Sequence, residues 1–359
     1  MASAQIGSSL SATRERYAHL IVEYCRTLLD FAEWEFQNLA SKQTFEIAGV
    51  SLRFGCSSPD YLRLCERAYP TASASEDEDL RPVTLAILDH ASLPALPFWP
   101  GASPGMGNVA LALAEQGLRG AYDPDHRIWY VYDPDRALAV QVMPSFDSRP
   151  AWEGSFPARL LIHWSARSED RGMIHAGTLG HAREGVFLAG AGGAGKSGTT
   201  LSGILNGLES AGDDYVAVRF AHGRIETQPV LRLMKQDEAG LRRLGLKSVA
   251  FEGPNWQGKF EFDFDSLRPG ARAGRLAMKA ILIPQISGAA RSSFRPASGR
   301  EAMMSLAPSS LYQLYGTWKE DFGLLASIAR ALPAYHLALS ENPAEIADAI
   351  RNFIGGNAS

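Results

Sequence analysis

One glycine-rich stretch, GAGGAGKS, restricts the folds open to this chain more than any other feature. It runs from Gly190 to Ser197 and fits the pattern G-x-x-x-x-G-K-[S/T]. The apolar segment VFLAG precedes it, and TTLSGILNGL, which can form a helix, follows it. A strand, a tight glycine turn and a helix in this order predict an α/β domain built around the turn.

The chemistry of this stretch predicts a phosphate site. Glycines let the backbone fold so that several N–H groups point inward, and a helix N-terminus adds positive potential. Lys196 would reach the β- and γ-phosphates of a nucleotide, and Ser197 would hold Mg²⁺. A glycine turn without a ligand is the alternative. The residues expected to bind the nucleotide are Gly190, Gly192, Gly193, Ala194, Gly195, Lys196, Ser197 and Gly198.

The first part of the chain predicts a smaller α+β domain over residues 1–150. Apolar side chains recur at three- and four-residue steps over 10–40, which predicts an amphipathic helix. Residues 45–54 alternate like one strand, and 57–69 resemble a capped helix. Two YDPD turns within 122–142 predict paired strands joined by Asp-Pro turns.

The second part, residues 151–359, predicts the α/β domain that contains the glycine loop. From about residue 172 short apolar strands alternate with loops and helices. Residues 145–154 are the expected junction, and 158–164 fit either a helix or a buried strand. The polar, acidic stretch 71–82 is expected to be a loop or an exposed linker.

The composition excludes several classes of protein. Hydrophobic residues make up 46% and charged residues 21% of the 359 residues, which is ordinary for a globular chain. A net charge of −4 gives no reason to expect a nucleic-acid or membrane-surface partner. The N-terminus has no apolar core typical of a signal peptide, and no apolar run is long enough for a transmembrane helix. Three cysteines without metal-ligand spacing indicate reduced thiols, so we expect a cytoplasmic protein.

A histidine and an acidic pair flank the glycine loop at short range. His175 lies 15 residues before Gly190, and Asp213 and Asp214 lie 17 and 18 residues after Lys196. Taken alone, a histidine is more often structural than catalytic, and Gly-Asp-Asp is common turn chemistry with solvated acids.

Taken together, these three elements resemble the HPr kinase/phosphorylase family and its relatives, which include the kinases of lasso-peptide precursors. The resemblance depends on His175, on Gly190–Ser197 and on Asp213–Asp214 in GDDYVAV. It extends over about residues 158–345 and is weak outside 172–218. The family shares its core with phosphoenolpyruvate carboxykinase, so the resemblance implies a central mixed sheet with the loop at one edge of a cleft.

The resemblance also implies an activity and a role for each residue. Asp214 would be the general base that takes the proton from an attacking hydroxyl as the γ-phosphoryl leaves ATP. Asp213 would support Mg²⁺ or water, Lys196 would neutralise the developing charge, and His175 would lie near the transferred group. The chain is therefore expected to be an ATP- and Mg²⁺-dependent kinase of a hydroxyl, with serine of a small protein or peptide as the expected acceptor.

The sequence departs from the family at two points that concern the acceptor. Gly198 stands where bifunctional HPr kinases carry a glutamate, and residues 229–241 replace a later signature that supplies a metal ligand. Asp237 and Glu238 are the acids available there. HPr is therefore not the expected acceptor, and a lasso-peptide precursor is one named possibility.

Two other functions stay open at this point. One is a small-molecule hydroxyl kinase with the same core, and the other is a nucleotide-sensing module without phosphotransfer. The chain has no N-K-x-D sequence for guanine, which favours ATP over GTP. The family resemblance allows a homo-oligomer.

Five further side chains have two interpretations each. Arg275, Lys279 and Lys259 could reach phosphates, although surface bases are the ordinary reading. Trp129 and Tyr130 could contact a peptide, although a half-buried aromatic strand is the default.

Overall fold

The computed structural model describes residues 2–70, 81–246 and 253–356, and the chain forms two compact units. The first contains Met1–Phe45, Val50–Cys65 and Ala72–Ser168, and the second contains Glu46–Gly49, Glu66–Thr71 and Glu169–Ser359. The loop expected over 71–82 lies almost wholly outside the described residues.

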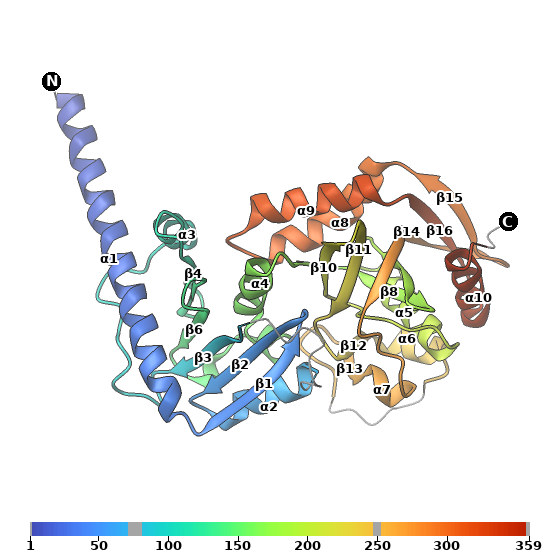
Figure 1. The fold of residues 1–359 in the computed structure, drawn as a ribbon, viewed down its shortest axis with the longest axis horizontal. Coiled ribbons are helices and arrows are strands. Elements are labelled where there is room, and N and C mark those ends of the chain that lie inside the picture. Colours follow the sequence, from blue (N-terminus) through green and yellow to red (C-terminus); the bar gives the residue numbers. More distant parts are fainter. Residues whose placement is uncertain (1, 71–80, 247–252, 357–359) are drawn as a thin grey trace. The chain divides into compact units, whose positions relative to one another are not determined.

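The first unit is a mixed six-stranded sheet with helices on both faces (Figure 1). Its strands are β1 (Ser41–Ile47), β2 (Val50–Cys56), β3 (Val83–Asp89), β4 (Arg119–Asp123), β5 (Ile128–Asp133) and β6 (Leu138–Met143). Its helices are α1 (Ala2–Asn38), α2 (Pro59–Ala68), α3 (Met106–Ala114) and α4 (Arg159–Ser168), with 3-10 turns at Phe146–Ser148 and Ala151–Gly154. The strand order is β1-β2-β3-β6-β5-β4, in which β2, β3 and β6 are parallel.

The YDPD repeat forms the antiparallel part of this sheet, as the sequence predicts. Asp123 accepts hydrogen bonds from the backbone N–H groups of Asp125 and His126, at 2.9 and 3.2 Å, and Asp133 repeats the turn. Trp129 and Tyr130 between the turns are 4% and 5% exposed, so neither is available to a peptide. Trp129 packs on Tyr24 of α1.

Two predictions for this unit need correction. Residues 45–54 are not one strand, because Ala48 and Gly49 take positive φ angles of 59° and 71° and turn the chain between β1 and β2. The expected junction at 145–154 is also displaced. Residues 159–168 form a helix, α4, that packs on β5 and β6, and the first unit therefore continues to Ser168.

The second unit is a mixed eight-stranded sheet, as the resemblance implied, with a separate two-stranded ribbon. Its strands are β7 (Gly172–Ile174), β8 (Gly177–His181), β9 (Glu184–Leu188), β10 (Val216–Ala221), β11 (Arg224–Pro229), β14 (Leu276–Ala289), β15 (Ser293–Ala297) and β16 (Ala334–Ser340). The ribbon is β12 (Leu233–Gln236) with β13 (Phe260–Asp263). The helices are α5 (Lys196–Leu205), α6 (Glu238–Arg243), α7 (Phe264–Leu267), α8 (Gly299–Gln313), α9 (Trp318–Ala331) and α10 (Pro343–Ile354).

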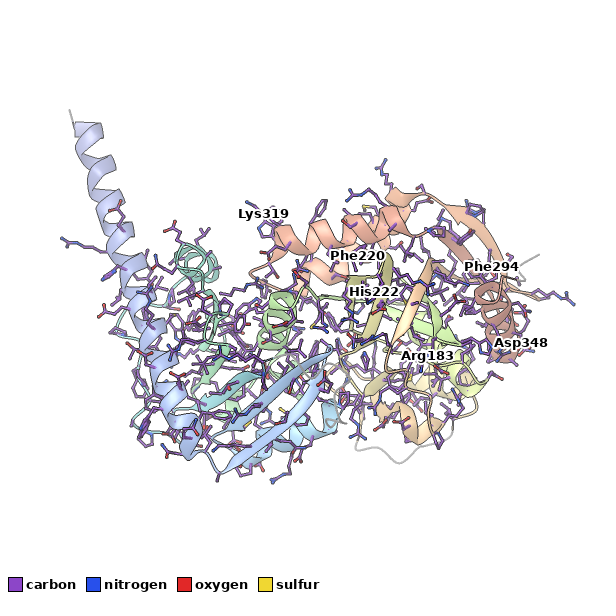
Figure 2. The ribbon with its side chains drawn as sticks, viewed as in Figure 1. Arg183, Phe220, His222, Phe294, Lys319 and Asp348 are labelled. Atoms are coloured by element: carbon purple, nitrogen blue, oxygen red, sulfur yellow. The ribbon has the colours of Figure 1, made fainter. Side chains whose placement is uncertain are left out.

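Three parallel strands, β9, β14 and β16, form the part of this sheet that leads to the glycine loop. Their side chains alternate between two apolar clusters, one shared with α8 and α9 and the other with α10. Phe294 of β15, labelled in Figure 2, stacks on Phe353 of α10, with 4.6 Å between the ring centroids. The carboxyl ends of parallel strands lie at one edge of a sheet, which is where open α/β folds bind ligands.

Side chains and caps account for other elements. Asn342 caps α10 by accepting from the N–H of Ala344, and Ser298 with Glu301 forms a capping box at α8. Cys25, Cys56 and Cys65 are buried and form no disulfide among the described residues, and they serve in packing, as predicted. In the part of the chain that the structure describes, no helix is both long and apolar enough to cross a membrane.

Candidate functional site

The glycine loop connects β9 to α5 at the carboxyl edge of the parallel strands. Gly190, Gly193 and Gly195 have φ angles of 155°, 82° and 98°, which side chains other than glycine rarely adopt. Gly195 is the residue immediately before α5, and it leaves the first N–H groups of that helix directed at the loop. The strand, the glycine turn and the helix therefore follow one another as the sequence pattern predicts, and phosphate binding at this turn stays a prediction.

Lys196 is folded back onto the loop. Its Nζ donates hydrogen bonds to the carbonyl oxygens of Gly190 at 2.6 Å and Ala191 at 3.2 Å. Burial lowers the pKa of this ammonium, while the carboxylates of Asp213 and Asp214 oppose the change. The ammonium thus lies within electrostatic reach of both acids.

The register of two strands brings His175 to Asp214. β10 pairs antiparallel with β7, and Val216 lies opposite Ile174. His175, next after Ile174, therefore lies close to Tyr215, which comes just before Val216. The rings of His175 and Tyr215 meet edge to face, with 5.3 Å between their centroids. The N–H of His175 donates to Ser310 Oγ at 2.9 Å, which fixes the backbone from α8.

The Asp214 carboxylate lies between a histidine and a lysine side chain. His175 Nε2 lies 2.9 Å from Oδ1, and Lys235 Nζ lies 2.8 Å from Oδ2. Burial alone would raise the pKa of Asp214, but Lys235 and His175 outweigh it and hold the pKa well below its ordinary value. Asp214 is therefore an ionised, oriented carboxylate at neutral pH.

Asp213 differs from Asp214 in that its pKa is raised and not lowered. Burial, and then the neighbouring charge of Asp214, raise its pKa to about 6, although Ser197, Lys196 and Thr200 oppose the rise. Its side chain is buried, and Oδ1 has no hydrogen-bond partner among the described residues. An unsatisfied buried carboxylate oxygen beside the Ser197 hydroxyl fits a hard cation such as Mg²⁺.

This fit needs few protein ligands. Among the described residues no group of three or more His, Cys, Asp and Glu side chains could enclose a metal ion. Mg²⁺ at a phosphate site takes one or two protein ligands and completes its shell with phosphate and water. Ser197 and Asp213 suffice for that arrangement.

Asp213→Asn should stabilise the protein above pH 6. A raised carboxyl pKa contributes stability that is fully present below about pH 4 and is lost as the pH rises through about 6. Asparagine mimics the protonated form, so the gain at pH 8 should be of the order of 1–3 kcal/mol in the free energy of unfolding. Urea unfolding of both proteins at pH 8 and pH 4 measures it, and an equal difference at the two pH values would contradict this account.

Lys235 is the residue of this site that the sequence analysis missed. It lies on β12, on a ribbon separate from the main sheet, and its side chain is almost fully buried. A buried lysine in the apolar context LRLMKQ is the signal that could have indicated it. Asp237, one of the two acids available nearby in the sequence, has a structural role. It caps α6 by accepting a hydrogen bond from the N–H of Gly240 at 2.7 Å.

Lys235→Met should move the acidic limb of the pH–rate profile to higher pH. The ammonium of Lys235 is the largest of the effects that oppose burial at Asp214, so its removal raises the pKa of that carboxyl. The pH dependence of kcat/KM for phosphoryl transfer measures the shift. Lys279→Met is the control, because Lys279 pairs with Glu184 at 2.6 Å and donates to the carbonyl of Ile354. An unmoved acidic limb would exclude Lys235 as the group that sets this pKa.

The other candidate bases separate into two groups. Lys279 is engaged by Glu184, and Arg275 lies 3.8 Å from Glu226, so both serve as surface bases. Lys259 instead acts on Lys196, since its positive charge lowers the pKa of that ammonium. Lys259 therefore has an electrostatic link to the loop.

Comparisons with known proteins add little to this geometry. No protein-family model matches the chain, and no curated protein is similar to it. Among solved structures, the Hpr(Ser) kinase/phosphatase from Coxiella burnetii is similar with a TM-score of 0.30 and 12% sequence identity. That likeness covers 50% of this chain and 95% of the other. A TM-score of this size supports no assignment of fold or activity, so the function must be argued from the site.

Proposed function

We propose that this protein is an ATP- and Mg²⁺-dependent kinase that phosphorylates a hydroxyl group. The observation that carries the proposal is the Asp214 carboxylate, held by His175 and Lys235 within electrostatic reach of the loop lysine, Lys196. A site that only binds a nucleotide needs the cradle and the lysine. An oriented carboxylate beside them supplies the further group that transfer to a hydroxyl uses.

Asp214 would act on the acceptor. In the proposed step the acceptor oxygen forms a bond to the γ-phosphorus, the bond from that phosphorus to the bridging oxygen breaks, and ADP leaves. The acceptor proton passes to Asp214. The low pKa of Asp214 keeps it ionised at neutral pH, and in a loose transition state the proton can leave late, so a weak base suffices.

The cationic groups would act on the donor. Lys196 would leave the carbonyl oxygens of Gly190 and Ala191 and bind the β- and γ-phosphates, and the N–H groups at the start of α5 would hold the phosphate oxygens. Ser197 and Asp213 would hold Mg²⁺, whose positive charge would neutralise negative charge on the nucleotide. His175 would keep Asp214 aimed at the acceptor.

The acceptor we propose is a serine of a small protein or peptide. The motif spacing that includes His175, the loop and the acidic pair resembles a family of protein and peptide kinases, and a lasso-peptide precursor fits that class. The first unit, without a phosphate loop of its own, would recognise the acceptor. No nucleic acid or membrane enters this proposal, and a homo-oligomer is compatible with it.

A phosphoryl-transfer assay tests the proposal. The full chain is incubated with Mg²⁺ and γ-labelled ATP, with peptides encoded beside its gene in one set of reactions and small hydroxyl compounds in another. We expect label on a serine of a peptide. Label only on a small compound would establish the small-molecule kinase instead, and tight ATP binding with no labelled acceptor would favour the nucleotide-sensing module.

A further inference from the structure

A cavity of about 490 Å³ opens directly beside the phosphate loop in the second unit. Gly195 and Gly198 form its loop side, Ile286 and Leu339 form an apolar wall, and Glu341 lies at its polar rim. Its volume is within the range of small-molecule sites, which hold roughly 300–1,000 Å³. None of the steps proposed above uses this space.

The cavity is continuous with the phosphate cradle. A side chain added at Gly195 would meet Leu339 Cδ1 at 3.0 Å and Ile286 Cγ1 at 3.7 Å. The loop glycine with a φ of 98° is thus pressed against the apolar wall. If the phosphates of a ligand lie on the loop, the remainder of that ligand would extend into the cavity.

A β-bulge shapes the wall. β14 pairs with β16 in regular register up to Ile286 opposite Leu339, and the register then shifts so that Ala289 lies opposite Ser340. The two extra residues are Ser287, whose Oγ donates to the carbonyl of Leu339 at 2.8 Å, and Gly288. Bulges of this kind re-aim neighbouring side chains and are frequent beside active sites.

Ile286 is unusual for a large apolar side chain, because 67% of it is exposed. A single exposed isoleucine needs no explanation by itself. Here it faces a cavity at the carboxyl edge of the parallel strands, beside Leu339, and so offers a flat apolar surface to an aromatic ring.

We propose that the nucleoside of the bound nucleotide occupies this cavity, with its purine ring packed on Ile286 and Leu339. This inference rests on the nucleotide binding in the proposed function, but not on phosphoryl transfer. The ring stacks on the apolar wall, and the polar rim with Glu341 and Arg243 faces the hydroxyl and amino groups of the nucleoside. Ile286 and Leu339 are then affinity determinants for nucleoside triphosphates and not for the phosphate chain alone.

Binding of two probes to the same variants tests this assignment. ATP and inorganic tripolyphosphate share the phosphate chain, and only ATP has a nucleoside. We expect Ile286→Ala to weaken ATP binding by about tenfold, the usual effect of a few missing methyl groups in an apolar pocket, and to leave tripolyphosphate binding unchanged. Isothermal titration of the full-length protein measures both affinities.

Phe220→Ala is the matched control. Phe220 lies on β10 in the hairpin that also contains His222, is 51% exposed, and does not line the cavity (Figure 2). Unchanged ATP affinity in Ile286→Ala, or equal losses for ATP and tripolyphosphate, would overturn the assignment. Failure of the kinase proposal has a different signature, since the wild type would then bind ATP without labelling any acceptor.

Discussion

Asp214→Asn is expected to abolish measurable phosphoryl transfer while ATP still binds. The amide keeps the size of the side chain and can still accept one hydrogen bond, but it cannot take a proton from the acceptor. Loss of a positioned general base costs about 10²–10⁴ in rate, so kcat should fall by that factor. The measurements are kcat with a peptide acceptor and the dissociation constant of ATP by titration calorimetry.

Glu226→Gln is the control for this variant. Glu226 is another half-buried carboxylate of the second unit, paired with Arg219 at 3.0 Å on the β10–β11 hairpin. It should retain activity. A retained kcat in Asp214→Asn would remove the base from the mechanism, and a lost ATP affinity at full stability would show that Asp214 serves nucleotide binding instead.

Lys196→Met should have the second largest effect, and it should act on both binding and rate. The ammonium is the group that would exchange the carbonyl oxygens of Gly190 and Ala191 for the phosphates. Removing one preorganised donor to a developing charge costs about 10²–10³ in kcat. ATP affinity should fall as well, in contrast to Asp214→Asn.

The stability of Lys196→Met separates this effect from misfolding. Burial lowers the pKa of Lys196, which means that its positive charge destabilises the folded protein. Replacement by the uncharged methionine should therefore leave the free energy of unfolding of the unliganded protein undiminished. Thermal unfolding without nucleotide checks this. Unchanged kcat and ATP affinity in Lys196→Met would show that the loop does not bind phosphate as proposed.

The sequence predicts the glycine loop and the residues near it in the chain, because these features depend on residues that are close together in the sequence. The glycine loop is a continuous stretch whose glycines take the positive φ angles that the motif requires. His175 directly follows β7, Asp214 shortly precedes β10, and the register of these two paired strands brings the side chains together. The YDPD turns were equally direct, since an aspartate caps each turn with its own side chain.

The sequence did not predict features that depend on contacts between residues far apart in the chain. Lys235 reaches Asp214 from a ribbon whose place depends on β13, more than 20 residues further along the chain. The turn at Ala48 depends on a φ of 59° in a residue type that gives no turn signal. Residues 158–164 fitted a helix or a strand, and packing of α4 on β5 and β6 decides between them. The cavity beside the glycine loop likewise depends on a bulge that composition does not reveal.

A structure with Mg²⁺, a non-hydrolysable ATP analogue and an acceptor peptide is the most direct measurement of the central claim. We expect Lys196 Nζ on the β- and γ-phosphates and a carboxylate oxygen of Asp214 within about 3 Å of the acceptor hydroxyl, which lies in line with the γ-phosphorus. An Asp214 side chain that stays between His175 and Lys235 but points away from the γ-phosphate would contradict the account. The loop would then be a nucleotide-binding site without a base for transfer.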